Sequence, residues 1–460
     1  MKNEFMKASA AILVIIIVGF LVTYNFLPME PGRAPQDARP SREMMEKDRP
    51  SDQVTVTYGP DDDRGRVSYT GDLVNGRREG RGVLIWKNGA KYEGPFKDDL
   101  RHGRGVMFYP SGETLYDGDF AYDRMQGQGT LIYAPDDERG WASYTGGFVN
   151  SKRHGRGTLI WKDGRRYEGQ WNDNQMHGQG ALTYASDDDR ERASYAGGFV
   201  GGRREGRGTM IWKDGSRYEG QWLDDDWHGQ GVLTSLSTNK NQASVYTGGF
   251  VHGRRSGPGR ATWDNGEKYD GEWKYGTRHG QGTFFWPNGN KHEGRWHDGQ
   301  LSGPGVLTYA PGDVRESYAG EYKYGLRHGS GTMIWRNGQK YEGRFYSGRM
   351  QGQGALTFQP DDPRKTYAGE FENDRLHGHG ALTWKDGRKY EGQMQDSRMH
   401  GRGVLTYPPG DQRLSYAGNF EDNRFHGQGT LIWRDGRKDE GPWQDGRIHS
   451  RVNFTIPVEK

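Results

Sequence analysis

The stretch YEGQWNDNQMHGQGALTY, residues 167–184, contains the pattern from which the fold can be predicted. Tyr167 and Gly169 alternate with polar residues, and after a turn Gly178 and Gly180 open a second alternating run. Alternation with a period of two predicts two short β-strands. The glycines are unexpected there, because glycine packs nothing inside a strand and loses entropy on ordering. We therefore expect the glycines to share a face with the aromatic residues and to leave slots in which neighbouring rings lie flat.

The same pattern recurs along almost the whole chain, as in a stacked repeat protein. Some units are short and others carry a polar insert, such as ASDDDRERAS at 185–194. Residues 54–68 match the second half of a long unit, so the array begins with a half repeat. The residues 449–457 lack the usual glycines and predict an atypical end, as expected for a cap. Units begin at Tyr69, Tyr92, Tyr116, Tyr144, Tyr167, Tyr195, Tyr218, Tyr246, Tyr269, His292, Tyr318, Tyr341, Tyr367, Tyr390 and Tyr416, and a degenerate unit begins at Asp439.

Each unit predicts two antiparallel strands, so that consecutive units continue one meandering sheet. Short units end in tight turns such as KNG at 87–89 and KDG at 162–164. Asn-Gly and Asp-Gly favour type I′ turns, in which both central residues have positive φ. Because only 32% of the residues are hydrophobic, we expect no second layer. We predict an all-β fold, an elongated, twisted, single-layer antiparallel sheet of stacked hairpins, with about 31 strands over residues 54–456 and a tail at 457–460.

The second glycine pair of each unit is expected to permit a β-bulge or a positive φ. Pro258 and Pro304 each stand between the two glycines of their unit. Proline has no N–H to donate to a neighbouring strand, so the middle residue of this motif is not needed in the ladder.

The N-terminal residues differ from the array. Residues 8–27 are uncharged and, as a helix, long enough to span a bilayer. They predict a transmembrane anchor after a short basic N-terminus at 1–7, and a cleaved signal peptide is the alternative. Residues 28–53 carry several prolines among mixed charges and predict an extended linker.

The charges that flank residues 8–27 bear on orientation. Lys2 and Lys7 favour an N-terminus inside the cell, whereas Arg33, Arg39 and Arg42 favour the reverse. We expect a single-pass membrane protein with its repeats on the non-cytoplasmic side, which in a bacterium is the periplasmic side of the inner membrane.

Composition excludes several classes of function. The 64 basic and 61 acidic residues nearly balance, which gives no basic face for nucleic acid. With no cysteine, the chain has no disulfide, no thiolate metal site and no cysteine nucleophile. No catalytic arrangement of Ser, His and Asp is evident, so an enzyme is not expected.

The motifs resemble the MORN repeat (membrane occupation and recognition nexus): Tyr-x-Gly-x-aromatic, then His-Gly-x-Gly, then an aromatic before Asn/Asp-Gly. The resemblance covers residues 54–456 and implies a long single-layer sheet that acts as a scaffold, contacts membrane lipid or forms dimers. Enzymes of this family carry a separate catalytic domain, and none is evident here. His292 and Asp439 depart from the motif tyrosine. The motif histidine is replaced at Glu79, Gln126, Glu205, Ser256, Ser302 and Gln351.

Three chemical signals have simple structural interpretations. His177 and its equivalents recur two strands apart, about 9.5 Å, which is too far for two of them to share a metal ion. They are expected to hydrogen-bond backbone in turns. The acidic inserts predict solvated turns rather than calcium loops, because no spaced loop with a later Glu follows them. The Gly-x-Gly elements lack the lysine and the helix of a phosphate site, and we expect no cofactor.

The tryptophans form the candidate contact surface. Most are expected to pack the sheet, yet a single layer cannot bury them fully, and an exposed aromatic groove is a candidate contact site. The leading hypothesis is a non-enzymatic, membrane-anchored scaffold that binds protein partners or itself, or that organises a membrane-associated assembly. The alternatives are direct binding of phospholipid and of polysaccharide. The candidate residues are Trp161, Trp171, Trp212, Trp222, Trp263, Trp273 and Trp335.

Overall fold

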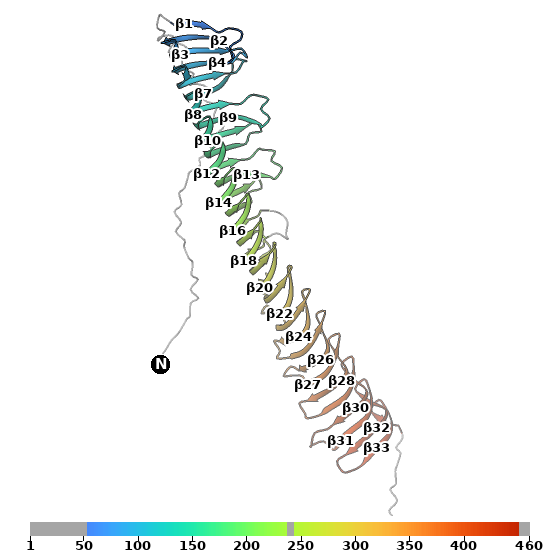
Figure 1. Ribbon diagram of the computed structural model, residues 1–460. Helices are drawn as coiled ribbons and strands as arrows, with labels where there is room; N and C mark the ends of the chain where they lie inside the picture. The colour runs from blue at the N-terminus through green and yellow to red at the C-terminus, as the bar shows by residue number, and fades with distance from the viewer. Residues whose placement is uncertain (1–52, 237–242, 450–460) are drawn as a thin grey trace, which may run out of the picture.

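The computed structural model describes residues 53–236 and 243–449. These residues form one 34-stranded antiparallel sheet, elongated and twisted, in which strands pair in chain order except at β5 and β6, which both pair with β4 (Figure 1). The first seventeen strands are β1 (Val54–Thr57), β2 (Arg66–Val74), β3 (Arg77–Trp86), β4 (Lys91–Lys97), β5 (Leu100–Arg101), β6 (Gly103–Phe108), β7 (Thr114–Ala121), β8 (Arg124–Ile132), β9 (Trp141–Val149), β10 (Lys152–Trp161), β11 (Arg166–Asn172), β12 (Gln175–Thr183), β13 (Arg192–Val200), β14 (Arg203–Trp212), β15 (Arg217–Leu223), β16 (Asp226–Thr234) and β17 (Val245–Val251). The others are β18 (Arg254–Thr262), β19 (Lys268–Lys274), β20 (Thr277–Phe285), β21 (Lys291–His297), β22 (Gln300–Thr308), β23 (Arg315–Lys323), β24 (Leu326–Trp335), β25 (Lys340–Tyr346), β26 (Arg349–Thr357), β27 (Arg364–Glu372), β28 (Arg375–Trp384), β29 (Lys389–Gln395), β30 (Arg398–Thr406), β31 (Arg413–Glu421), β32 (Arg424–Trp433), β33 (Lys438–Gln444) and β34 (Arg447–Ile448).

The predicted single-layer sheet is confirmed, and the half repeat at its start is β1, which pairs with β2. The sheet has three more strands than the 31 that were expected. The degenerate unit at Asp439 forms β33 and β34, and one second strand is interrupted into β5 and β6, both of which pair with β4. No helix in the described part of the chain is long and apolar enough to cross a membrane. The predicted anchor at 8–27 lies outside the described residues, as does nearly all of the linker.

The core is a row of rings along one face of the sheet. Tyr167 is completely buried, and its hydroxyl donates to the carbonyl of Gln170 at 3.0 Å. Its ring meets Trp171 of its own unit and Phe199 of the next edge-on, with centroids 5.2 Å and 5.1 Å apart. Such edge-to-face pairs contribute about 0.5–1.5 kcal/mol beyond area burial. Because each tyrosine contacts two units, the row stabilises the joints between repeats.

Two glycines supply the slot beneath each ring. Gly169 and Gly180 face each other across β11 and β12. A Cβ on Gly169 would lie 2.5 Å from the Tyr167 hydroxyl, and one on Gly180 would lie 2.5 Å from its ring carbon Cε2. The ring therefore occupies the space that a side chain would need, as predicted.

Gly178 has a different role from the one predicted. The expected bulge is present, because the register shifts from Gly169–Gly180 to Gln170–His177. Gly178 adopts φ +58°, and a Cβ there would collide with the side-chain amide of Gln170 rather than with a ring. The prediction that Gly178 forms a ring slot is wrong, because the bulge breaks the alternation from which its face was inferred.

The turn types are also reversed from the prediction. At KNG only Gly89 has a positive φ, and its N–H donates to Trp86 O. This geometry is a type I turn followed by a left-handed glycine. The two-residue turns with two positive φ values lie at the opposite edge, for example at Asp173 and Asn174. The Asn/Asp-Gly pair is compatible with both turn classes, and loop length selects between them.

Candidate binding surfaces

The structure divides the candidate tryptophans into two groups. Trp171, Trp222 and Trp273 belong to the packed row and are only 3–4% exposed. Their indole N–H groups donate to backbone carbonyls, as from Trp171 to Gly157 O at 3.1 Å. These three therefore present neither a ring face nor a donor to a ligand. The half-buried group, at the ends of second strands, is Trp161, Trp212, Trp263 and Trp335.

Arginines cover one flank of the aromatic row, a feature that sequence analysis missed. The Arg153 guanidinium carbon lies 4.3 Å from the Trp171 ring and 4.2 Å from the Trp141 ring. Its Nη2 donates to Asn174 O in the next hairpin at 2.9 Å. Burial lowers the pKa of Arg153. The signal in the sequence was an arginine two residues before the Gly-x-Gly motif, which recurs as Arg204 and Arg255.

The polar inserts use their carboxylates in ion pairs. Asp188 binds the Arg192 guanidinium at 2.6 Å, and that guanidinium lies 4.1 Å from the Tyr184 ring. The arginine holds the pKa of Asp188 well below its usual range. Asp62 with Arg66 and Asp411 with Arg413 repeat the arrangement. The inserts thus fold onto the sheet through arginine.

The opposite face of the sheet carries a polar furrow of about 1050 Å³ that runs across strands β8–β16. One wall is a cross-strand ladder that includes Thr158, Glu168 and Ala181. The other wall is a row of exposed long polar side chains, and the floor is the backbone of the glycine row. The residues of that second wall are Gln128, Arg156, Gln170, Gln179, Arg207, Gln221 and Gln230.

The motif histidine position contacts the following hairpin. Where it is occupied by Glu79 or Gln126, the side-chain oxygen accepts the N–H of a residue in the next turn at 2.9–3.1 Å. Glu205 and Gln351 do the same. The Glu and Gln departures from histidine therefore preserve an acceptor. His177 itself is exposed, and its carbonyl lies 3.5 Å from the Tyr167 hydroxyl.

One core position lacks its tyrosine. His292 is fully buried, and neither of its ring nitrogens has a partner among the described residues. Burial lowers its pKa to about 4, so that the imidazole is neutral at pH 7. By contrast Tyr341 donates to Arg344 O at 2.9 Å, and burial raises its pKa to about 12. The packed core separates into two clusters next to His292, one ending at Trp296 and the other beginning at Tyr309.

This repeated geometry agrees with a comparison against family models. The MORN repeat model matches fifteen segments between residues 69 and 436, and each segment begins at the unit start expected from the sequence. These segments cover well over half of the chain. The protein therefore belongs to the MORN-repeat family. The matched segments are 69–91, 92–114, 116–138, 144–165, 167–188, 195–217, 218–235, 246–268, 269–291, 292–314, 318–340, 341–362, 367–387, 390–412 and 416–436.

Among curated proteins, the chain is similar to alsin of Rattus norvegicus and of Homo sapiens. Each match is 30% identical over 193 residues and covers 40% of this chain but only 10% of alsin. Two solved structures align weakly. The TCP10 domain of Danio rerio CPAP has a TM-score of 0.17 at 10% identity, covering 62% of this chain and 99% of that one. The TCP domain of Drosophila melanogaster SAS-4 has a TM-score of 0.15 at 15% identity, covering 35% and 77%. Superpositions this poor support no conclusion.

Proposed function

We propose that the protein is a non-catalytic scaffold whose repeat sheet binds an extended segment of a partner protein in the polar furrow. The observation that carries this proposal is the furrow itself. It presents amide and guanidinium groups at regular cross-strand spacing, and these groups suit the carbonyls and side chains of an extended polypeptide. Many weak, equivalent contacts along one sheet add up to useful affinity.

Two features favour protein over the alternative ligands. Acidic residues alternate with basic ones beside the furrow, and Arg166 pairs with Glu168 at 2.6 Å. An anionic membrane is usually met by unbalanced clusters of Lys and Arg. Sugar rings would need exposed aromatic faces, whereas the residues that line the furrow include no aromatic side chain. We further propose that residues 8–27 anchor the scaffold in a membrane with the repeats on the non-cytoplasmic side.

Site-specific photo-crosslinking in the native cell tests the binding surface. A photoreactive residue at Gln170, in the furrow, should give a discrete protein adduct, whereas the same residue at Tyr275, an exposed turn residue, should not. Replacing both Arg156 and Arg207 with Ala should remove the adduct. Lipid or polymer adducts at Gln170, or equal adducts at both positions, would overturn the proposal.

A C-terminal reporter tests the placement. A reporter fused after Lys460 that is active only outside the cytoplasm should be active in membrane fractions. Activity of a cytoplasm-specific reporter, or recovery of a shortened chain in the soluble fraction, would contradict the anchored arrangement.

A further inference from the structure

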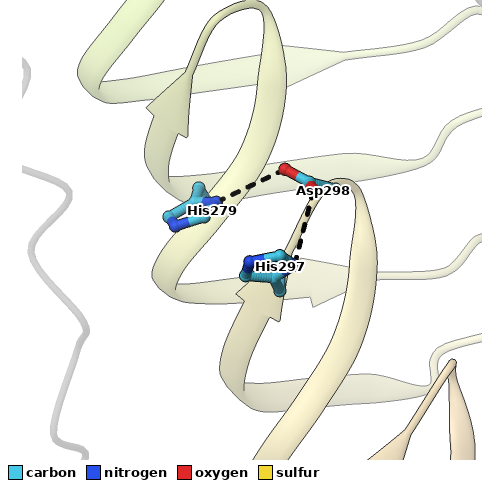
Figure 2. Close-up of side chains that lie close together, drawn as sticks. All are labelled: His279, His297 and Asp298. Carbon is cyan, nitrogen blue, oxygen red and sulfur yellow. Dashed lines mark ion pairs between the residues drawn. The ribbon is translucent and has the colours of Figure 1, made fainter.

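Two histidines and an aspartate converge at one edge of the sheet, beside the two-residue turn between β21 and β22 (Figure 2). His279 lies on β20, and its Nδ1 is 3.9 Å from Asp298 Oδ1. His297 ends β21, and its Nδ1 is 3.4 Å from Asp298 Oδ2. The rings of His279 and His297 have centroids 5.0 Å apart. One ligand atom from each of the three residues lies within 4.8 Å of the others.

We propose that His279, His297 and Asp298 bind a divalent transition-metal ion of the Zn²⁺ class. Imidazole nitrogen and carboxylate oxygen are ligands that Zn²⁺ accepts, and a water molecule completes four-coordination. In tetrahedral coordination with bonds of about 2.1 Å, two ligand atoms on one Zn²⁺ lie about 3.4 Å apart, so a pair 4.8 Å apart must close by about 1.4 Å. His297 and Asp298 are largely exposed, which leaves their side chains free to rotate.

The His279 side chain gives a second reason to place a ligand here. Its Nδ1 is buried and has no hydrogen-bond partner among the described residues. At the same position of other units, Glu79 and Gln126 satisfy the equivalent site by accepting an N–H from the next turn. An unpartnered buried nitrogen costs free energy, and a metal ion would remove that cost.

The combination occurs once in the chain. The residue before the two-residue turn varies among the units, for example Asn172, Leu223 or Lys274, and His297 is the single histidine at that position. Beside His328 the corresponding neighbour is Tyr346, with ring centroids 5.3 Å apart. Motif histidines of neighbouring units are too far apart to share a metal ion. That limit does not apply here, because only His279 is a motif histidine, whereas His297 and Asp298 lie at the turn of the next hairpin.

The position of the site gives it a role in the array. The ion would join β20 to the hairpin β21–β22, which is the unit headed by His292 and the place where the packed core divides. That unit lacks the tyrosine hydroxyl bond of its neighbours. A ligand that binds only the folded state stabilises it by RT ln(1 + [L]/Kd). The metal would therefore attach the hairpin at which the packed core divides to the unit that precedes it.

Titration of the full-length chain with Co²⁺ and Zn²⁺ tests the site. Three variants substitute residues that the chain itself uses at equivalent positions: His279→Gln as at Gln126, His297→Asn as at Asn172, and Asp298→Asn as at Asn373. Each should bind Zn²⁺ at least tenfold more weakly and lose the visible absorption of bound Co²⁺. His328→Gln, the matched control, should titrate like the parent. Identical titrations for the parent and the three variants would overturn the site.

Hydrogen exchange tests the role at the joint. Added Zn²⁺ should slow exchange across residues 280–300 in the parent and leave Asp298→Asn unchanged. Tight Zn²⁺ binding without such protection would overturn the role in attaching the β21–β22 hairpin to β20. Protection that persists in Asp298→Asn would show that the ion acts elsewhere.

Discussion

The two regions of the sheet cover the flank of the aromatic row with different chemistry. In the N-terminal region, β1–β21, arginines such as Arg153 and Arg204 alternate with apolar residues and stack on the rings. In the C-terminal region, β23–β34, every hairpin after Arg327 uses an apolar side chain instead. Those residues are Met350, Leu376, Met399, Phe425 and Ile448.

The difference shows what the fold requires of the side chain that covers this flank of the aromatic row. A single-layer sheet has no second layer, so long side chains at the turn edge must shield the rings from water. The aliphatic stem of an arginine does this while its guanidinium hydrogen-bonds the next turn, and a Leu or Met does it by burial alone. The backbone is the same in both regions, because shape rather than charge is needed. The regions meet at His292, where the core is least continuous.

Two substitutions of residues that cover the aromatic row, one in each region, should differ most in their effect on stability. Leu376→Ala removes a side chain that is 3% exposed and should cost about 2–5 kcal/mol of local unfolding free energy. Arg153→Leu places in the N-terminal region the residue type that the C-terminal region uses. It should change stability by less than about 1 kcal/mol, because it removes a buried charge together with its hydrogen bond.

Hydrogen exchange by mass spectrometry is the appropriate measurement, since a repeat array need not unfold in two states. Equal losses for the two variants would show that the arginine is more than a cover for the rings.

Acid should weaken the joint between the regions. The pKa of His292 is lowered to about 4 in the folded chain, against about 6.5 when unfolded. Above pH 6.5 neither state binds the proton, and between pH 6.5 and 4 only the unfolded state does. Stability of β21–β22 should therefore fall as the pH falls through this window, by about 3 kcal/mol.

Exchange measured from pH 7 to pH 4, corrected for intrinsic rates, would reveal the loss in β21–β22. The repeat headed by Tyr341 is the internal reference and should lack this component. A parallel decline in both repeats would contradict the role of His292.

The glycine slots should be common to both regions. Gly180→Val and Gly354→Val both drive a side chain into a tyrosine ring and should each cost about 1–3 kcal/mol, although Val favours strands. Gly305→Val should cost less, because it faces the smaller ring of His292. Local exchange of the three variants gives the order, and a tolerated Gly180→Val would refute the slot.

Restoring the motif tyrosine should give the smallest effect. His292→Tyr supplies a hydroxyl that can donate to a backbone carbonyl, as Tyr341 does, and should stabilise the joint by about 1 kcal/mol. Slower exchange in β21 and β22 is expected, together with loss of the acid response described above. A faster exchange would mean that the site is shaped for imidazole.

The repeat boundaries, the two strands of each unit and the single antiparallel layer could all be predicted from the amino-acid sequence. These follow from local signals: alternation with a period of two, regularly placed glycines, and turn residues at fixed intervals. The fifteen unit starts could be read directly from the sequence. The slot beneath Tyr167 could be predicted because alternate residues of a strand lie on the same face.

The way in which neighbouring repeats contact one another could not be predicted from the sequence pattern and is known from the three-dimensional structure. The face of the sheet on which a residue lies was predicted from the alternation of side chains along the strand. The bulge at Gly178 breaks this alternation and therefore changes the role of that glycine. Burial of Trp171 depends on Tyr144 and Arg153 of the preceding unit, which the unit of Trp171 does not itself specify. His279 meets His297 and Asp298 because the bulge of one unit lies beside the turn of the next. Contacts between units depend on register across the joint, and a local pattern does not contain that register.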